Sequence, residues 1–194
     1  MNKDNYLIIN LLFLNKRSNN LKKTITSNMN KTSQTKKSTQ KAVFAEGCFW
    51  GVEDLFSKLK GVVSTTVGYA GGHIKNPNYL MVCTGLTGHA ESVEVEFDPK
   101  VISYQELLNV FWNSHDPTTV NRQGPDYGSQ YRSIIFYNNA EQKELAELSK
   151  KSLEKSKKFQ NPIVTSIEQL EIFYPAEEYH QDYIKKHGGN SCHF

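Results

Sequence analysis

The sequence is short of the residues that mark several protein classes. Among 194 residues there are only three cysteines, Cys48, Cys83 and Cys192. So small and odd a number excludes the disulfide framework of a small secreted domain, and no Cys-x-x-Cys pair indicates a zinc site. A reducing compartment with a reactive thiol pair fits better. The longest apolar run, residues 6–14, is short and interrupted by Asn10, so we expect no membrane span.

Acidic residues are nearly absent from the first 40 positions. This segment has eight Lys and Arg residues against the single acid Asp4, so its net charge is about +7. The net charge of the whole chain is +3, so the remaining residues together carry about −4. The positive charge is therefore a property of the segment. Because no basic stripe with interleaved aromatics follows it, we expect no nucleic-acid binding.

Residues 1–40 are rich in Asn, Lys, Ser and Thr, a composition that predicts a disordered basic leader. Two interpretations stay open: an extension without function, for which Met29 is an alternative start, or a mitochondrial transit peptide. We expect a cytoplasmic protein, or a mitochondrial one if the leader is a transit peptide. Residues 41–194 have the length of one domain with a real core, and we expect a flexible tail from about residue 187.

What the sequence does have is a distinctive stretch at residues 46–51, Glu-Gly-Cys-Phe-Trp-Gly. An apolar run with strand propensity, residues 41–45, precedes it. An apolar stripe at helical spacing follows it, made of Val52, Leu55, Phe56 and Leu59. Cys48 would then lie where the backbone N–H groups and dipole of a helix start stabilise a thiolate. The alternative is a buried structural cysteine beside two core aromatics.

The remaining pattern alternates short strands and helices. Strands are predicted over residues 62–70, 89–97 and 131–137, with one or two more between 163 and 173. Helices are predicted from a capping box at Ser103–Glu106, from Asn139 to about Lys158, and over Glu177–Lys186. A long polar loop, residues 118–130, is long enough to suggest a function. The pattern favours an α+β two-layer sandwich.

Several motifs together resemble one family, the A-type peptide methionine sulfoxide reductases. They are Gly-Cys-Phe-Trp-Gly at 47–51 and the segments 68–72, 76–79, 88–91, 111–117, 126–132 and 174–180. The resemblance implies a two-layer α/β sandwich with a ferredoxin-like core and reduction of methionine S-sulfoxide, free or in proteins. It also implies no metal or organic cofactor and thioredoxin as reductant, and we expect a monomer.

The resemblance assigns four residues to the attack on the sulfoxide. Cys48 is the nucleophile and Glu91 the acid, whose site would have to raise its pKa for it to keep a proton. Tyr79 and Tyr131 carry over as hydroxyl donors to the sulfoxide oxygen. Without the resemblance, Glu91 would be read as a solvated strand residue and the tyrosines as core-edge residues.

The resemblance also supplies a pocket and a second thiol. Phe49 and Trp50 would wall the substrate methyl group, and Asp126 would position the substrate or Tyr131, although it would ordinarily be a turn former. Cys192, on a Gly-Gly-Asn-Ser tail, is the candidate resolving cysteine, and Cys83 is predicted to be buried and inert.

Two rival functions remain open at this point. A cysteine hydrolase would pair Cys48 with a histidine, and three are available: His89, His115 and His180. We interpret these three as hydrogen-bonding scaffold. A catalytically silent module that binds oxidised proteins would keep the aromatic pocket and tolerate loss of Cys48.

Overall fold

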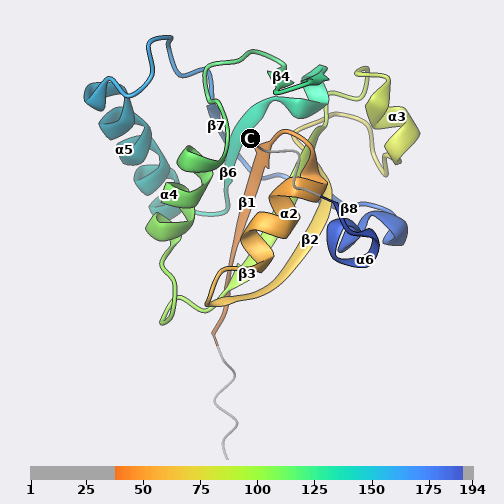
Figure 1. Ribbon diagram of the computed structural model, residues 1–194, viewed down its shortest axis with the longest axis horizontal. Coiled ribbons are helices and arrows are strands. Elements are labelled where there is room, and N and C mark those ends of the chain that lie inside the picture. The colour runs from red at the N-terminus through yellow and green to blue at the C-terminus, as the bar shows by residue number, and fades with distance from the viewer. Residues whose placement is uncertain (1–37, 190–194) are drawn as a thin grey trace, which may run out of the picture. The chain divides into compact units, whose positions relative to one another are not determined.

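A computed structural model describes residues 38–189 and builds them around one six-stranded sheet (Figure 1). The strand order is β7-β6-β1-β3-β2-β8, and only the β6–β7 pair is parallel. The strands are β1 (Gln40–Glu46), β2 (Val62–Ala70), β3 (Ala90–Phe97), β6 (Ser133–Tyr137), β7 (Ser166–Gln169) and β8 (Phe173–Pro175). The predicted strands are confirmed, with small shifts at their ends.

Strand β1 lies inside the sheet and leads directly to Cys48. It pairs with β3 on one side and β6 on the other, with Phe44 opposite Val93 and Glu46 opposite Ser133. A strand held on both edges gives the residue that follows it a fixed starting point, and this is how the fold positions the candidate nucleophile.

Three helices cover one face of the sheet: α2 (Phe49–Ser57), α4 (Tyr104–Ser114) and α5 (Ala140–Ser156). Their apolar residues form the main core with the inward side chains of β1, β2 and β3. The predicted capping box is confirmed, because Ser103 and Glu106 bond each other's backbone N–H groups. Asn139 caps α5 as expected, its side chain accepting from the Gln142 N–H. The α+β class is confirmed.

The opposite face of the sheet carries a smaller apolar cluster. Its side chains come from β1, the end of β2, the start of β3 and from β6, and Leu170 and Phe173 pack against them. Extended chain therefore covers this face, and the helices form a single layer.

Three local features differ from the sequence prediction. The apolar residues before Thr84 form a short helix, α3 (Tyr79–Cys83), capped by Asn78, whose side chain accepts from the Met81 N–H. The polar loop contains a hairpin, β4 (Arg122–Gln123) with β5 (Asp126–Tyr127), and a turn, η1 (Ser129–Tyr131). The final helix is broken into η2 (Glu178–His180) and α6 (Tyr183–His187), because Asp182 between them has a left-handed backbone.

Part of the sequence lies outside the described residues. This applies to the predicted leader up to residue 37 and to Cys192 with the tail around it. Within residues 38–189, no helix is both long and apolar enough to cross a membrane.

Candidate active site

Cys48 is placed at the start of α2 by the way β1 ends. After Glu46, Gly47 takes a φ of +110°, a conformation that favours glycine, and turns the chain toward the helix. Cys48 is the N-cap residue, with φ −58° and ψ 117°, and is half-buried. Cys48 is therefore at the N-terminus of α2, where unpaired backbone N–H groups and the helix dipole stabilise negative charge.

Glu91 lies at the same helix start and is almost completely buried. Its Oε2 accepts a hydrogen bond from the Phe49 N–H at 3.0 Å, so the residue after the nucleophile contacts the candidate acid. Burial raises the pKa of Glu91 to about 8; the Phe49 hydrogen bond opposes this rise and the charge of Asp126 adds to it. The interpretation of Glu91 as a solvated strand residue is wrong. The carboxyl is mostly protonated at neutral pH.

Tyr131 and Asp126 complete this part of the site. Burial raises the pKa of Tyr131, and the negative charges of Glu91 and Asp126 raise it further, with a smaller contribution from Cys48. The phenol therefore lies within electrostatic range of all three groups and stays protonated. Residues from the start of α2, from β3, from β5 and from η1 converge at one place.

Tyr79 comes to the site from α3, the helix that the sequence pattern missed. Its pKa is raised by burial, by a hydrogen bond to Cys83 and by the charge of Cys83, with further contributions from Glu91 and Tyr131. Its backbone N–H donates to Glu177 Oε1 at 3.0 Å. Both candidate hydroxyl donors thus share the neighbourhood of Glu91.

Aromatic rings form one wall of the site. Phe49 packs against the imidazole of His180, with ring centroids 5.2 Å apart, and Tyr79 lies 4.5 Å from the same imidazole. The Trp50 indole donates to His180 Nδ1 at 3.1 Å and stacks on Tyr183 at 3.8 Å. The two residues predicted as walls are therefore held by side chains of the C-terminal segment.

Sequence reasoning missed the role of Glu177. Its Oε1 accepts from the Tyr79 N–H and its Oε2 from the Tyr69 hydroxyl, both at 3.0 Å. Burial tends to raise the pKa of Glu177, but these hydrogen bonds outweigh it, and the pKa lies below the ordinary value. The only signal in the sequence was its place in the 174–180 motif.

The structure corrects the prediction for Cys83. This residue was expected to be buried, but it is exposed, and its sulfur contacts the Tyr79 hydroxyl. The cause is the short helix α3, which turns only Val82 into the core. Cys83 is therefore a neighbour of the candidate site.

His89 serves the scaffold, as predicted. The ring is buried and lies between the Gly72 N–H, which donates to Nδ1 at 3.1 Å, and the Ile74 carbonyl, 2.8 Å from Nε2. A Cβ on Gly72 would lie 2.4 Å from this ring, so the close approach requires glycine. In residues 38–189 no group of three or more His, Cys, Asp or Glu side chains is arranged to hold a metal ion.

The arrangement combines a thiol at a helix start, a protonated buried carboxyl and two neutral phenols. Such a site can attack an electrophilic centre with sulfur while it donates hydrogen bonds and a proton to an oxygen. Fold and site together thus define a thiol-based enzyme of α+β class.

Comparison with known proteins specifies the family. The profile described as "Peptide methionine sulfoxide reductase" matches residues 40–194. The chain is 60% identical over 154 residues to the peptide methionine sulfoxide reductase MsrA of Methanothermobacter thermautotrophicus, covering 79% of this chain and 91% of that protein. It is 62% identical over 149 residues to MsrA of Methanosarcina acetivorans, covering 77% and 79%.

Solved structures agree with the sequence comparison. Reduced Mxr1 of Saccharomyces cerevisiae superposes with a TM-score of 0.75 at 39% identity, covering 80% of this chain and 91% of that one. Methionine sulfoxide reductase A of Corynebacterium diphtheriae gives 0.71 at 38% identity, covering 79% and 77%. The chain belongs to the MsrA family of peptide methionine sulfoxide reductases, which are oxidoreductases. The hydrolase and the silent-module alternatives are therefore wrong.

Proposed function

We propose that Cys48 attacks the sulfur of methionine S-sulfoxide as a thiolate while Glu91 protonates the departing oxygen. The observation that carries this proposal is the Glu91 carboxyl, whose pKa of about 8 and bond to the Phe49 N–H put a proton donor at the start of α2. The attack yields methionine and a sulfenic acid on Cys48. The attack forms a bond between the two sulfurs, and Glu91 protonates the sulfoxide oxygen. The oxygen then passes to the Cys48 sulfur as its bond to the substrate sulfur and the sulfur–sulfur bond break, so Cys48 is oxidised by two electrons and methionine is reduced by two.

Tyr79 and Tyr131 support the same step as hydrogen-bond donors. Their raised pKa values keep both phenols neutral, so each can donate to an oxygen whose negative charge grows in the transition state. Phe49 and Trp50 would hold the substrate methyl group, and Asp126 would orient Tyr131 or the substrate. A fixed oxygen site and a fixed methyl pocket accept one hand of the sulfoxide, so R-sulfoxide should not be reduced.

The enzyme must then recover its thiol. A second thiol condenses with the Cys48 sulfenic acid, forming a disulfide and releasing water, and an external dithiol reduces that disulfide. We assign the second thiol to Cys192, which lies outside the described residues, and the reductant to thioredoxin. Support for the reductant is the structure of Mxr1 in complex with Trx2, which matches this chain with a TM-score of 0.55 at 28% identity.

The test of the proposal counts thiols and product together. The enzyme is mixed with methionine S-sulfoxide and no reductant, and we expect about one methionine released and two thiols lost per chain. Cys48→Ser should release none, because a hydroxyl is a much weaker nucleophile at neutral pH. Residual turnover of Cys48→Ser within about tenfold of the wild type would contradict the assignment.

A second variant tests the resolving cysteine. Cys192→Ser should release about one methionine and then stop with thioredoxin as sole reductant, because no disulfide forms. Dithiothreitol should restore turnover, since it reaches the sulfenic acid directly. Peptide mapping after one turnover should find Cys48 joined to Cys192, whereas a Cys48–Cys83 disulfide would move the resolving role to Cys83.

A further inference from the structure

A second buried carboxyl lies close to the site, and the proposed reaction does not use it. Glu46, the last residue of β1, is completely buried. Its Oε2 accepts from the Ser114 hydroxyl at 2.8 Å and lies 3.2 Å from His115 Nδ1. Among the described residues, its Oε1 has no hydrogen-bond partner. Burying a carboxyl with one oxygen unsatisfied costs stability, so its presence here calls for a reason.

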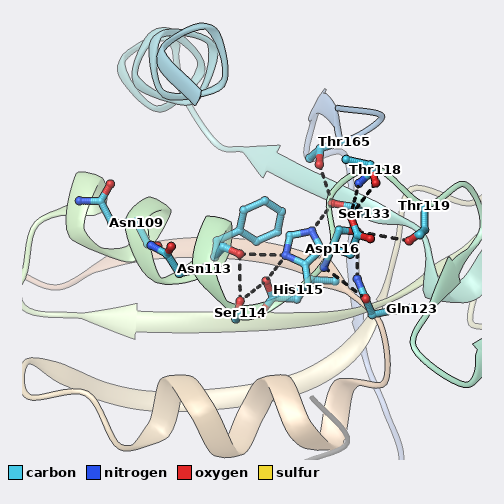
Figure 2. A network of polar contacts seen from close by, with 12 residues as sticks. Asn109, Asn113, Ser114, His115, Asp116, Thr118, Thr119, Gln123, Ser133 and Thr165 are labelled. Carbon is cyan, nitrogen blue, oxygen red and sulfur yellow. Dashed lines mark hydrogen bonds and ion pairs between the residues drawn. The ribbon is translucent and has the colours of Figure 1, made fainter. Parts of the chain in front are cut away.

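Glu46 begins a chain of polar contacts, of which Figure 2 shows the part from Ser114 and His115 to Ser133 and Thr165. His115 Nδ1 lies 2.8 Å from the Phe111 carbonyl and so must carry a proton, because a carbonyl only accepts. His115 Nε2 is 2.7 Å from Ser133 Oγ, which in turn is 2.8 Å from Thr165 Oγ1. We call this chain the Glu46–Thr165 network: Glu46, Ser114, His115, Ser133 and Thr165.

Two members of this network, Glu46 and Ser133, lie two positions from a residue of the site. Only Gly47 separates Glu46 from Cys48, and only Arg132 separates Ser133 from Tyr131. Glu46 and Ser133 are themselves cross-strand partners in the β1–β6 pair. The segments that carry Cys48 and Tyr131 therefore join the sheet at the same cross-strand pair, Glu46 and Ser133, and the network connects the side chains of this pair.

The network also reaches Asp126 through its neighbour Asp116. The Asp116 N–H donates to Gln123 Oε1 at 3.3 Å, and Gln123 Nε2 donates to the Asp116 carbonyl at 3.2 Å. Gln123 pairs with Asp126 in the β4–β5 hairpin. Asp116 follows His115 directly, so the hairpin that carries Asp126 is fastened to the same point (Figure 2).

We infer that Glu46 and His115 are positioning residues that fix the mutual geometry of Cys48 and Tyr131. Gly47 has no side chain to restrict its backbone, so the direction of Cys48 depends on how firmly Glu46 is held before it. This inference rests on the proposed roles of Cys48 and Tyr131. Displacing a reacting group by about 1 Å can cost about a hundredfold in rate, so loss of the network should lower kcat more than it raises KM.

A purely structural role would also make removal of Glu46 destabilising, so a matched control is needed. Gln142 provides one at the other end of the same strand. It is buried, and its Nε2 donates to the Lys41 carbonyl at 2.7 Å while its Oε1 accepts from the Asn138 N–H at 2.9 Å. Gln142→Ala therefore removes a hydrogen bond to β1 and another to Asn138, without touching the Glu46–Ser133 pair next to Cys48.

The experiment compares kcat, KM and the thermal midpoint of Glu46→Ala, Glu46→Gln and Gln142→Ala with free methionine S-sulfoxide and dithiothreitol. We expect Glu46→Ala to lower kcat by about tenfold or more with KM changed less than about threefold. Glu46→Gln, which keeps the volume and one acceptor oxygen for Ser114, should recover most of the loss. Gln142→Ala should lower the midpoint but leave kcat within about twofold.

The inference is overturned if Glu46→Ala lowers the thermal midpoint as Gln142→Ala does and leaves kcat within about twofold of the wild type. It is also overturned if Glu46→Gln loses as much as Glu46→Ala, because the network would then not depend on its hydrogen bonds. If Glu46→Ala does not fold, Ser133→Ala takes its place with the same expected kcat loss. Failure of the proposed function is recognised separately, by turnover in Cys48→Ser.

Discussion

Glu91 and Glu177 lie on two sides of the same site and behave in opposite ways. Glu91 is buried with a single backbone donor, and its pKa rises to about 8. Glu177 accepts from a phenol and from backbone N–H groups, and its pKa falls below the ordinary value. Glu91 is the more deeply buried of the two and has fewer donors, so burial dominates its pKa, whereas at the less buried Glu177 the hydrogen bonds outweigh burial.

The largest effect is expected from removing the proton of Glu91. Glu91→Gln keeps the size of the side chain and an acceptor for the Phe49 N–H, but an amide has no proton to give at this step. Single-turnover release of methionine should slow by about a hundredfold or more, while substrate binding survives. A rate equal to that of the wild type would place the acid elsewhere.

The next effect concerns alkaline pH. Because the pKa of folded Glu91 is raised to about 8 from an ordinary value of 4.5, the group holds its proton at neutral pH and loses it as the pH passes 8. The single-turnover rate should therefore fall on the alkaline side, and this limb should be absent from Glu91→Gln. Identical alkaline limbs in the two proteins would contradict the assignment.

The opposite pKa shifts of Glu91 and Glu177 should also give opposite pH dependences of the free energy of unfolding. Folded Glu91 binds a proton that the unfolded chain has released between about pH 4.5 and 8, so its contribution to the free energy of unfolding falls as pH rises through that window. Glu177 has a lowered pKa, so its contribution is present above the ordinary value and is lost as pH falls. In denaturant unfolding, Glu91→Gln should lose the fall in stability between about pH 4.5 and 8, and Glu177→Gln should lose the fall on the acid side of the ordinary carboxyl pKa.

A smaller effect on the rate is expected from Glu177→Gln. Its amide NH2 replaces one acceptor for the Tyr79 N–H or the Tyr69 hydroxyl, so α3 is held less firmly. The single-turnover rate should fall by about tenfold or less, because Tyr131 still donates to the oxygen. A loss as large as that of Glu91→Gln would show that the two carboxyls do not divide the work as proposed.

The smallest effect is expected from Cys83→Ala. The Cys83 sulfur is a weak hydrogen-bond partner, and the Tyr79 hydroxyl that contacts it remains available to substrate. Turnover with thioredoxin should stay within about twofold of the wild type. Loss of thioredoxin-dependent turnover with single turnover intact would instead identify Cys83 as the resolving cysteine.

Much of the fold was predictable because its signals are local. The strand before Cys48, the stripe of α2 and the capping box of α4 are written within a few residues of each other. The helix α3 was missed because five residues are too few for a helical period, and the exposure of Cys83 was missed with it.

In the candidate site too, what local motifs indicate was predictable and what long-range contacts produce was not. Motifs located Glu91 in the sequence, but not its burial, its hydrogen bond from the Phe49 N–H 42 residues away or the effect of the Asp126 charge on its pKa. Glu177 acts on Tyr79 across 98 positions, and Glu46 on Ser114 across 68. No local pattern in the chain indicates such contacts, because they exist only after the sheet has brought distant segments together.

The central position of β1 in the sheet also determines how late in translation the active site can fold. A ribosome releases β1 early, yet one of its neighbours, β3, ends at Phe97 and the other, β6, begins at Ser133. The aromatic wall can form only later, because the His180 and Tyr183 that contact Trp50 are synthesised after β6. A nascent chain therefore carries the Cys48 thiol through most of translation before the side chains that surround it in the folded enzyme have been synthesised.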